Sequence, residues 1–436
     1  MSAAGRPEAA TYDVVGIGIG PFNLSLAALA DEVDELDVLF LDDKPEFSWH
    51  SGMLLDGTTL QVPFLADLVT LVDPTNRWSF LSYLRAHERL FPFYFFERFE
   101  VPRREYDHYC RWVASSLSSC RFGARVQRVD WDGAAFTVTY ADQSTGRCIE
   151  VVARNVVLGI GTAPSTPSAF DGVLGKRVFH SAEYKHNAAA LDGARDVTVV
   201  GSGQSGAEVF LDLLRQQPET GTRLRWLTRS PAFAPMEYSK IGLEHFTPDY
   251  TRYFRGLPEG TRDALYPAQW QLYKGISAET IAEIYDVLYE RSVAGSRPAV
   301  TLSPNIAIRA AEPRGEGFRL TCDEVQQERE HVVDTDAVVL ATGYRARPPE
   351  VLEPLGDAIL TDPAGRLQVD ADYRVATSSD VDAGLYVQNA ELHTHGVGTP
   401  DLGLGAWRAA TILNSVSGRN VHPLPDRTAF TSFGVA

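Results

Sequence analysis

The chain has 436 residues, which is too long for one ordinary domain, and we expect two or three. Hydrophobic residues make up 44% and charged residues 22% of it, as in a globular protein with a full core. A formal net charge of -17 argues against a nucleic-acid partner, because no basic stretch could neutralise a phosphate backbone, and it favours a small cationic partner.

The N-terminal segment predicts neither a leader nor a membrane anchor. Its first 13 residues, MSAAGRPEAATYD, lack a basic region followed by an apolar core, and no apolar run approaches the ~18 residues of a membrane helix. The four cysteines show no CxxC spacing and no paired histidines, so we expect thiols of a reducing compartment. We therefore predict a cytoplasmic protein with no membrane partner.

The first predicted unit begins with YDVVGIGIGP at residues 12–21, a short strand that runs into glycines and is followed by a helical pattern. Gly16, Gly18, Gly20 and Pro21 form a turn that would let a pyrophosphate approach the backbone at a helix N-terminus. Asp42 ends the next predicted strand, about where an acid binds a ribose 2′-OH. Together these features predict a dinucleotide site; the alternative is an ordinary glycine-rich turn.

A second unit repeats this arrangement about 185 residues later. Residues 154–167 predict a crossover strand out of the first unit, and residues 196–217 predict another strand, glycine turn and helix. The second turn is a complete GxGxxG, made of Gly201, Ser202, Gly203, Gln204, Ser205 and Gly206. Arg229 follows its second strand where an acid would bind a ribose, which predicts a 2′-phosphate and hence NADPH. A solvated surface charge is the alternative for Arg229.

The remaining chain completes an α/β fold with two Rossmann-like dinucleotide-binding domains and a smaller, mostly helical substrate-binding region. Residues 334–349 predict a strand that returns to the first sheet, and residues 384–416 predict a strand, a glycine-rich loop and a final helix. We assign residues 1–165 and 336–436 to the FAD domain, 190–240 and 299–335 to the NADPH domain, and 241–298 to the helical region.

Two dinucleotide sites on one chain predict a flavoprotein that is reduced by a nicotinamide, with FAD on the first unit and NADPH on the second. The chain has no CxxC that could form a redox-active dithiol, so dioxygen is the expected electron acceptor. His393 and His395 lie two residues apart without an obvious third ligand, and we predict no metal site.

Several stretches together resemble the FAD- and NADPH-dependent N-hydroxylating monooxygenases of siderophore biosynthesis. These stretches are GIGIGPFNLSLAAL, FSWHSGML, LQVPFLADLVTLVDPTN, VVGSGQSGAE, HFTPDY, LATGY and THGVGTPDL, which run from about residue 12 to 415. The family comprises lysine N6- and ornithine N5-hydroxylases and their diamine-hydroxylating relatives. The resemblance implies N-hydroxylation of an amine through a C4a-hydroperoxyflavin made from reduced FAD and O2.

The resemblance also implies roles by position. Trp49, His50 and Gln61 match the flavin-contacting residues, Asp42 matches the ribose acid, and Val126 lies in the segment that touches the adenine. Pro400, Asp401 and Leu402 match the loop near the isoalloxazine. Residues 202–205 and Arg229 match NADPH contacts, and residues 340–344 match a marker that joins the domains.

Position 66 is where this chain departs from the lysine and ornithine enzymes. Their FLKDL motif has a Lys that pairs with the substrate α-carboxylate, whereas this chain reads FLADL with Ala66. Leu243 and Leu272 align with their substrate-binding asparagines. A buried carboxylate without a partner costs several kcal/mol, so we expect a diamine such as putrescine or cadaverine. L-Lysine or L-ornithine remains the alternative if Lys240 or Lys274 supplies the missing cation.

Other residues complete the predicted substrate site. Glu244, Glu391 and Asp401 are candidates to hold the second ammonium group, and Gly403 is a further substrate-side candidate. We expect a small-molecule amine and O2 as partners, and the resemblance implies a homo-oligomer, either a dimer or a tetramer. Two other activities stay open: a Baeyer–Villiger or heteroatom monooxygenase of the same fold, and an NADPH oxidase-like flavoprotein that does not hydroxylate an amine.

Overall fold

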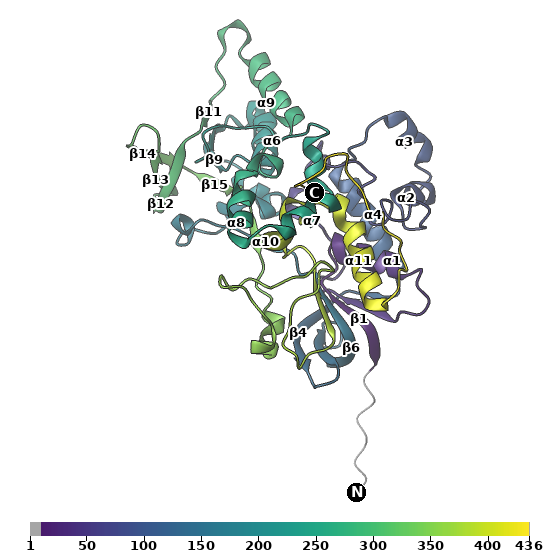
Figure 1. Ribbon diagram of the computed structural model, residues 1–436. Helices are drawn as coiled ribbons and strands as arrows, with labels where there is room; N and C mark the ends of the chain where they lie inside the picture. The colour runs from purple at the N-terminus through teal and green to yellow at the C-terminus, as the bar shows by residue number, and fades with distance from the viewer. Residues whose placement is uncertain (1–9, 436) are drawn as a thin grey trace.

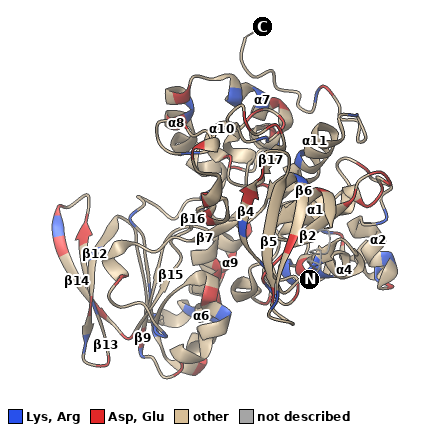
Figure 2. Ribbon diagram, turned by 90° about the horizontal axis from the view of Figure 1, so that it is seen from below, with Lys and Arg blue, Asp and Glu red and all other residues tan. Residues whose placement is uncertain are grey.

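The computed structural model describes residues 10–435, so most of the segment on which the absence of a leader is predicted lies outside it. The two largest sheets lie side by side in two connected units (Figures 1 and 2). Within the described residues, no helix is both long enough and apolar enough to cross a membrane.

The first sheet contains seven strands in the order β3-β2-β1-β6-β5-β4, with β17 paired to β6. Its strands are β1 (Thr11–Ile17), β2 (Val38–Leu41), β3 (Cys120–Arg121), β4 (Ala124–Trp131), β5 (Phe136–Asp142), β6 (Cys148–Leu158) and β17 (Gly384–Val387). Parallel pairing joins β1 to β2 and to β6, while β4, β5 and β6 form an antiparallel meander. The predicted Rossmann-like unit is therefore confirmed, with a meander added to one side.

Helices cover one face of this sheet. In chain order they are α1 (Pro21–Ala30), α2 (Phe80–Ala86), α3 (Leu90–Phe96), α4 (Arg103–Ser116) and α11 (Gly405–Ser417), with α2 and α3 packed outside α4. The first and last of them pack against each other although nearly 400 residues separate them in the sequence. Their buried side chains share one hydrophobic cluster with those of α4, which places the largest part of the core between these helices and the sheet.

The second sheet is parallel throughout, in the order β11-β10-β9-β15-β8. Its strands are β8 (Val178–His180), β9 (Asp196–Val200), β10 (Arg223–Leu227), β11 (Val300–Ser303) and β15 (Ala337–Leu340). An antiparallel sheet of β12 (Ile306–Arg314), β13 (Gly317–Glu324) and β14 (Arg329–Thr335) adjoins it, and the neighbouring helices are α5 (Tyr184–Asn187) and α6 (Gln204–Thr220). The second Rossmann-like unit is thus confirmed.

The prediction that residues 334–349 return to the first sheet is wrong. Their strand β15 pairs in parallel with β9 and β8 of the second sheet, with Val338 opposite Thr198. All four of its residues are buried, and such a continuous apolar run fits the centre of any parallel sheet, so its pattern does not specify which one. The strand that returns is β17, and the boundary drawn at residue 336 comes too early.

The chain crosses between the two units twice, and the two crossings pair with each other. Strand β7 (Thr162–Pro164) follows β6 and pairs antiparallel with β16 (Tyr344–Ala346), which follows β15 (Figure 2). The Thr342 hydroxyl donates to the Ser165 carbonyl at 2.6 Å, and a His180 ring nitrogen lies 3.0 Å from the Gly343 carbonyl. The LATGY stretch therefore lies at the junction, as the resemblance implies.

Residues 241–298 are mostly helical, as predicted. They form α7 (Pro248–Gly256), α8 (Glu259–Ala268), α9 (Ala278–Arg291) and the short 3-10 turns η5 (Gly242–Phe246) and η6 (Trp270–Leu272). This region divides in two: α7 and α8 pack against α10 (Leu392–His395), whereas α9 packs against α6 (Figure 1). One end of the region therefore contacts the C-terminal loop, and the other contacts the second unit.

Candidate cofactor and substrate site

The first glycine turn joins β1 to α1 in a geometry that only glycine permits. Gly18 has a φ of +87°, and a Cβ there would lie 2.5 Å from the Gly159 carbonyl oxygen. A side chain on Gly16 would overlap the Phe40 ring, whereas Gly20 faces open space within 4 Å. Pro21 is the first residue of α1, and no side chain caps the helix. The turn therefore leaves an open cradle at a helix N-terminus, which fits a pyrophosphate.

Asp42 lies against this turn at the end of β2. One carboxylate oxygen accepts from the Ile19 N–H at 2.7 Å and the other from the Lys44 N–H at 2.9 Å. Its carbonyl accepts from the Ala124 N–H at the start of β4, two residues before the half-buried Val126. Asp42 and Val126, which are predicted to contact the ribose and the adenine of FAD, therefore both lie close to this turn. Asp42 also orders the backbone there, a role that its position in the sequence does not reveal.

Two of the three predicted flavin contacts, Trp49 and His50, lie near the junction of the two units. The Trp49 ring lies 5.3 Å from that of Tyr106, and His50 has a left-handed backbone (φ +50°) and a ring 5.7 Å from that of Tyr344. The His50 side chain is accessible to solvent, and partial desolvation, followed by the positive charge of Arg103, lowers its pKa to about 4.

Two buried polar groups, one on the third predicted flavin contact and one at the junction, have no partner among residues 10–435. They are the amide nitrogen of Gln61 and the hydroxyl of Tyr344. An unpaired buried polar group costs about 1–3 kcal/mol, so a native fold normally supplies a partner. A flavin ring, which carries several carbonyl oxygens and ring nitrogens, would provide partners here. The residues present therefore fit FAD.

The second glycine turn has the same open geometry at the N-terminus of α6. Gly201 has a φ of +120°, and a Cβ on Gly206 would lie 2.3 Å from the Gly201 carbonyl oxygen. Gly203 precedes the helix without a capping side chain, and Ser202 and Ser205 are half-buried beside it. These backbone groups fit a second dinucleotide.

Gln204 and Arg229 differ in their freedom to reach that dinucleotide. Both ends of the Gln204 amide are already used: its nitrogen donates to Glu208 and to Thr280 at 3.0 Å, and its oxygen accepts from the Ser277 N–H. Arg229 follows β10 and is exposed. Arg229 is therefore available for a 2′-phosphate, whereas Gln204 connects the turn to α9.

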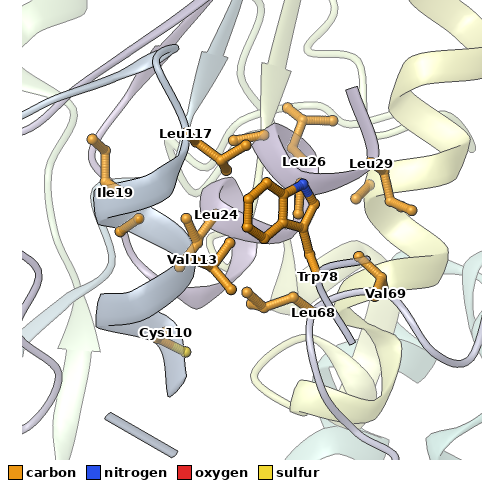
Figure 3. Packing of buried hydrophobic residues seen from close by; sticks show 14 of the residues in the cluster. Ile19, Leu24, Leu26, Leu29, Leu68, Val69, Trp78, Cys110, Val113 and Leu117 are labelled. Carbon is orange, nitrogen blue, oxygen red and sulfur yellow. The ribbon is translucent and has the colours of Figure 1, made fainter. Parts of the chain in front are cut away.

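Hydrogen bonds and core packing fix the second half of the FLADL loop. Asp67 accepts four hydrogen bonds, from the N–H groups of Val69, Thr70 and Phe80 and from the Thr70 hydroxyl, all between 2.6 and 2.9 Å. Leu68 and Val69 pack with α1, α4 and Trp78 in the first core (Figure 3). Ala66 therefore has a fixed position, and its methyl group is 5% exposed.

Three of the predicted substrate residues meet beside this loop. A Cβ on Gly403 would lie 3.9 Å from the Ala66 Cβ and 2.8 Å from Asp401 Oδ1. That oxygen accepts from the Gly403 N–H at 2.7 Å. The surrounding protein raises the pKa of Asp401 to about 6, because burial disfavours the charged carboxylate more than the Gly403 N–H and Arg408 favour it. The Asp401 carboxylate thus lies near Ala66. One of its oxygens accepts a hydrogen bond from Gly403, and the other is available to bind a substrate.

The other candidates for the second ammonium are engaged elsewhere. Both oxygens of Glu244 accept from backbone N–H groups, of Phe430 at 2.9 Å and Thr431 at 2.8 Å, and hold the C-terminal segment. Glu391 is fully buried 3.2 Å from Arg408 and accepts from the Ala390 N–H. Asp401 is therefore the better placed of the three.

The helical region supplies apolar neighbours to the C-terminal loop. Leu243 lies in η5, which packs against the turn at Gly396–Gly398, and Leu272 packs in a cluster with Val397. Leu402 is half-buried against the first core and Pro400 is exposed. Lys240 and Lys274 are both exposed, and the backbone of Lys274 lies near Gly203 of the second turn.

The histidines of the C-terminal loop have structural neighbours. A His393 ring nitrogen lies 2.7 Å from the Leu367 carbonyl. His395 stacks on Tyr373 with ring centroids 4.5 Å apart, and one of its nitrogens lies 2.8 Å from the Thr394 hydroxyl. Burial lowers the pKa of both, so the neutral ring is favoured.

Sequence reasoning missed three groups near the site. Tyr106 lies against Trp49, and burial raises the pKa of Tyr238, with smaller contributions from the carboxylates of Glu279, Glu100 and then Asp401. Arg103 at the start of α4 forms a two-pronged ion pair with Glu208 of α6, at 2.7 and 2.8 Å. None of them belongs to a recognisable motif, and long-range contacts of this kind leave no local pattern in the sequence.

Comparison with known proteins gives a consistent result. Residues 10–346 match the family described as L-lysine 6-monooxygenase/L-ornithine 5-monooxygenase. Rhizobactin siderophore biosynthesis protein RhbE of Rhizobium meliloti is 46% identical, over 97% of this chain and 95% of that protein. A putrescine N-hydroxylase of Shewanella oneidensis is 42% identical, over 97% of this chain and 84% of that protein. The FAD-bound crystal structure of DfoA, a cadaverine monooxygenase of Erwinia amylovora, superposes with a TM-score of 0.94 at 39% identity and covers 98% and 99% of the two chains.

Proposed function

This chain belongs to the L-lysine 6-monooxygenase/L-ornithine 5-monooxygenase family, and from that premise we propose that it N-hydroxylates one primary amine of an aliphatic diamine. Putrescine and cadaverine are the proposed substrates, with NADPH and O2 as co-substrates and FAD as the cofactor. The hydroxylamine product would serve the biosynthesis of a hydroxamate siderophore, in keeping with the names of the relatives.

The observation that carries this proposal is the pairing of Ala66 with Asp401. The resemblance to lysine- and ornithine-hydroxylating enzymes implies a Lys at this position, which would neutralise an α-carboxylate, whereas this chain has Ala66. The carboxylate of Asp401 lies across Gly403 from it: a Cβ on Gly403 would be 3.9 Å from the Ala66 Cβ and 2.8 Å from Asp401 Oδ1. An amino acid would bring its own carboxylate towards Asp401, and a diamine would bring an ammonium. The charges therefore favour the diamine.

FAD, when bound, supplies the redox chemistry that activates O2 with electrons from NADPH. The residues proposed to hold it are those of the first turn with Asp42, Trp49, His50 and Gln61. The second turn and Arg229 are proposed to hold NADPH. The Arg103–Glu208 ion pair would then fix the orientation of the two units, because it connects α4 to α6.

The substrate's two nitrogens need opposite protonation states. An alkylamine has a pKa near ~10.4, and only its neutral form is a nucleophile. Asp401 would hold one nitrogen as an ammonium, while desolvation at the opposite end of the bound diamine would favour the neutral form of the other. Asp401 is thus proposed to bind and orient the diamine, with no side chain acting as a nucleophile.

The proposal extends to the setting of the reaction. The formal net charge of -17 would attract a dication to the protein surface. We place the enzyme in the cytoplasm, since it depends on NADPH. We also propose that it works as a homo-oligomer, either a dimer or a tetramer.

The experiment that tests N-hydroxylation follows NADPH oxidation and hydroxylamine formation together. Purified enzyme loaded with FAD is mixed with NADPH and air-saturated buffer, with putrescine, with cadaverine, or with no amine. We expect hydroxylamine to form with a diamine, in near-stoichiometric amounts to the NADPH consumed. Hydrogen peroxide as the only product with both diamines would show an oxidase instead and would refute the proposal.

A further inference from the structure

We propose that the face formed by α2 and α3 is the surface through which two copies of this chain associate. We define this α3 face by its exposed apolar side chains: Leu81, Leu90, Phe91, Tyr94, Phe95, Phe96 and Phe99. It identifies the interface of the homo-oligomer proposed above and therefore rests on that part of the proposed function. Figure 1 shows α2 and α3 at the edge of the molecule, outside α4.

Helix α3 is apolar on every side, yet none of its residues is buried. Its sequence, LFPFYFF, has no polar residue except the tyrosine hydroxyl. A helix that is hydrophobic all round normally lies inside a protein. Here Phe91 is 79% exposed, Phe95 73% and Tyr94 70%, and Phe99 just beyond the helix is 61% exposed. The helix therefore has the composition of a buried helix, but no other part of residues 10–435 covers it.

The area of the face matches one side of a stable protein interface. At about 200 Å² per aromatic side chain, the exposed fractions of its five rings amount to roughly 650 Å², and two leucines add to it. The largest apolar patch on a monomer is typically ~300–600 Å². Each partner in a standard interface contributes ~800 Å². The face is thus large for a monomer and close to the size that a stable dimer needs.

The shape and charges of the face favour a second copy of the same chain. Between Phe64, Leu90 and Phe99 lies a groove of about 490 Å³, beside the ridge formed by Phe91 and Phe95 one turn apart. A ridge next to a groove can be self-complementary about a two-fold axis. Glu97 and Arg98 also line the groove, and within residues 10–435 neither takes part in an ion pair. Across a two-fold axis, each could meet its opposite on the partner.

The same charges argue against a lipid surface as the occupant. Acidic and basic residues both border the face, and the chain as a whole carries a formal charge of -17, so anionic lipids would repel it. A membrane-bound amphipathic helix normally has a polar face rich in Lys and Arg, and α3 has no charged residue. The observations therefore favour protein over lipid.

The face is continuous with the substrate loop. Phe64 stacks on Phe99 with ring centroids 6.0 Å apart, its N–H donates to the Phe99 carbonyl at 2.7 Å, and it precedes Ala66 by two residues. A partner chain that covers Phe99 would press on Phe64 and steady this loop. Association is therefore expected to lower KM for the diamine by a few-fold.

The test measures the mass of the full-length FAD-loaded protein by light scattering at about 10 µM. We expect the wild type to have at least twice the mass of one chain, and the variant Phe91→Glu/Phe95→Glu to have half the wild-type mass. The matched control is Tyr285→Glu/Tyr289→Glu on α9, which replaces two rings that are 67% and 66% exposed with the same spacing, and its mass should not change. The α3 variant should also show a higher KM for the diamine.

A charge exchange tests the two-fold pairing without removing an aromatic ring. Glu97→Arg should weaken association, and Glu97→Arg/Arg98→Glu should restore it. Wild-type protein with the mass of a single chain, or an α3 variant with wild-type mass, would overturn this inference, as would sedimentation of the wild type with anionic lipid vesicles. Mass does not depend on turnover, so an enzyme that hydroxylates diamines as a single chain would refute this inference and the proposed homo-oligomer but not the proposed N-hydroxylation. An inactive oligomer would refute the proposed N-hydroxylation but not this inference.

Discussion

At the scale of single residues, we propose that Ala66 and Asp401 determine substrate choice. Ala66 is fixed by its neighbour Asp67, whose carboxylate accepts four hydrogen bonds, so a side chain at position 66 projects into a defined place. Asp401 lies on the other side of Gly403 and has one oxygen free of hydrogen bonds within the described chain. A change of charge at either position should therefore alter the binding of a diamine more than a change of size.

The variant Ala66→Lys should lose diamine binding. Its ammonium would compete with the substrate's ammonium for Asp401, and we expect KM for cadaverine to rise at least tenfold, equivalent to about 1.4 kcal/mol. Ala66→Met is the matched control, since it has similar length without charge. Steady-state hydroxylamine formation measures both variants. An equal rise in KM for the two would mean that volume, not charge, decides.

Asp401 should make diamine binding depend on pH. Its pKa is raised to about 6, so the carboxylate is ionised above pH 6 and becomes neutral as the pH falls through that value. At pH 5 about one tenth remains ionised, and KM for putrescine should be roughly tenfold higher than at pH 7. Asp401→Asn should have a high KM at both pH values. If the two proteins keep the same KM ratio from pH 7 to pH 5, another group controls binding.

How much of the site could be predicted differs from residue to residue. The resemblance to the family identified Ala66, because the motif around it is continuous and the departure is a single letter. Tyr238 and Arg103 could not be found, since each reaches the site from a segment that has no motif. For Glu244, the sequence could not reveal that the C-terminal segment would occupy both carboxylate oxygens.

At the scale of elements, the two glycine turns were predictable and the assignment of strands to sheets was not. Each turn combines a strand, a positive-φ glycine and a helix within about 25 consecutive residues, so local sequence specifies it. Strand β15 reads as four apolar residues, and either parallel sheet could bury it. Its place is decided by contacts with β8 and β9, which lie about 160 and 140 residues earlier.

The ion pair between α4 and α6 should matter for both stability and NADPH use. Arg103 and Glu208 are 12% and 4% exposed, so removing one leaves a buried charge without a partner, which costs about 3–5 kcal/mol. Glu208→Leu should lower the melting temperature by several degrees and, since Glu208 also holds Gln204, raise KM for NADPH. Thermal denaturation and NADPH kinetics measure these effects.

The double variant Arg103→Met/Glu208→Leu provides the control. It removes both charges, and we expect it to melt above Glu208→Leu despite carrying one more substitution. If the double variant is instead destabilised by the sum of the effects of Arg103→Met and Glu208→Leu measured separately, the ion pair does not bridge the two units in the way described here.

At the scale of the whole molecule, the negative charge should assist capture of a dication. The formal net charge is -17, and salt screens such a field with a Debye length of ~10 Å at 0.1 M. Raising NaCl from 20 to 300 mM should lower kcat/KM for putrescine several-fold. The monocation butylamine serves as the comparison and should lose less. An equal loss for both amines would show that the field does not contribute.

The order of the units along the chain explains why the presence of two units was easier to predict than the residues at which each unit begins and ends. The chain leaves the first unit and returns, and its two crossings pair as β7 and β16. Two glycine turns in one sequence indicate two units, whereas the residue at which the chain returns depends on sheet contacts. The return at β17 therefore becomes visible only in three dimensions.

The central claim is that the site accepts an ammonium where the lysine and ornithine enzymes of the family would accept a carboxylate. Cadaverine and L-lysine differ only by the α-carboxylate, so the most direct measurement is the ratio of kcat/KM for hydroxylamine formation from these two amines. An unpaired buried carboxylate costs several kcal/mol, and the ratio should be ~100 or more in favour of cadaverine. A ratio near or below one would contradict the account.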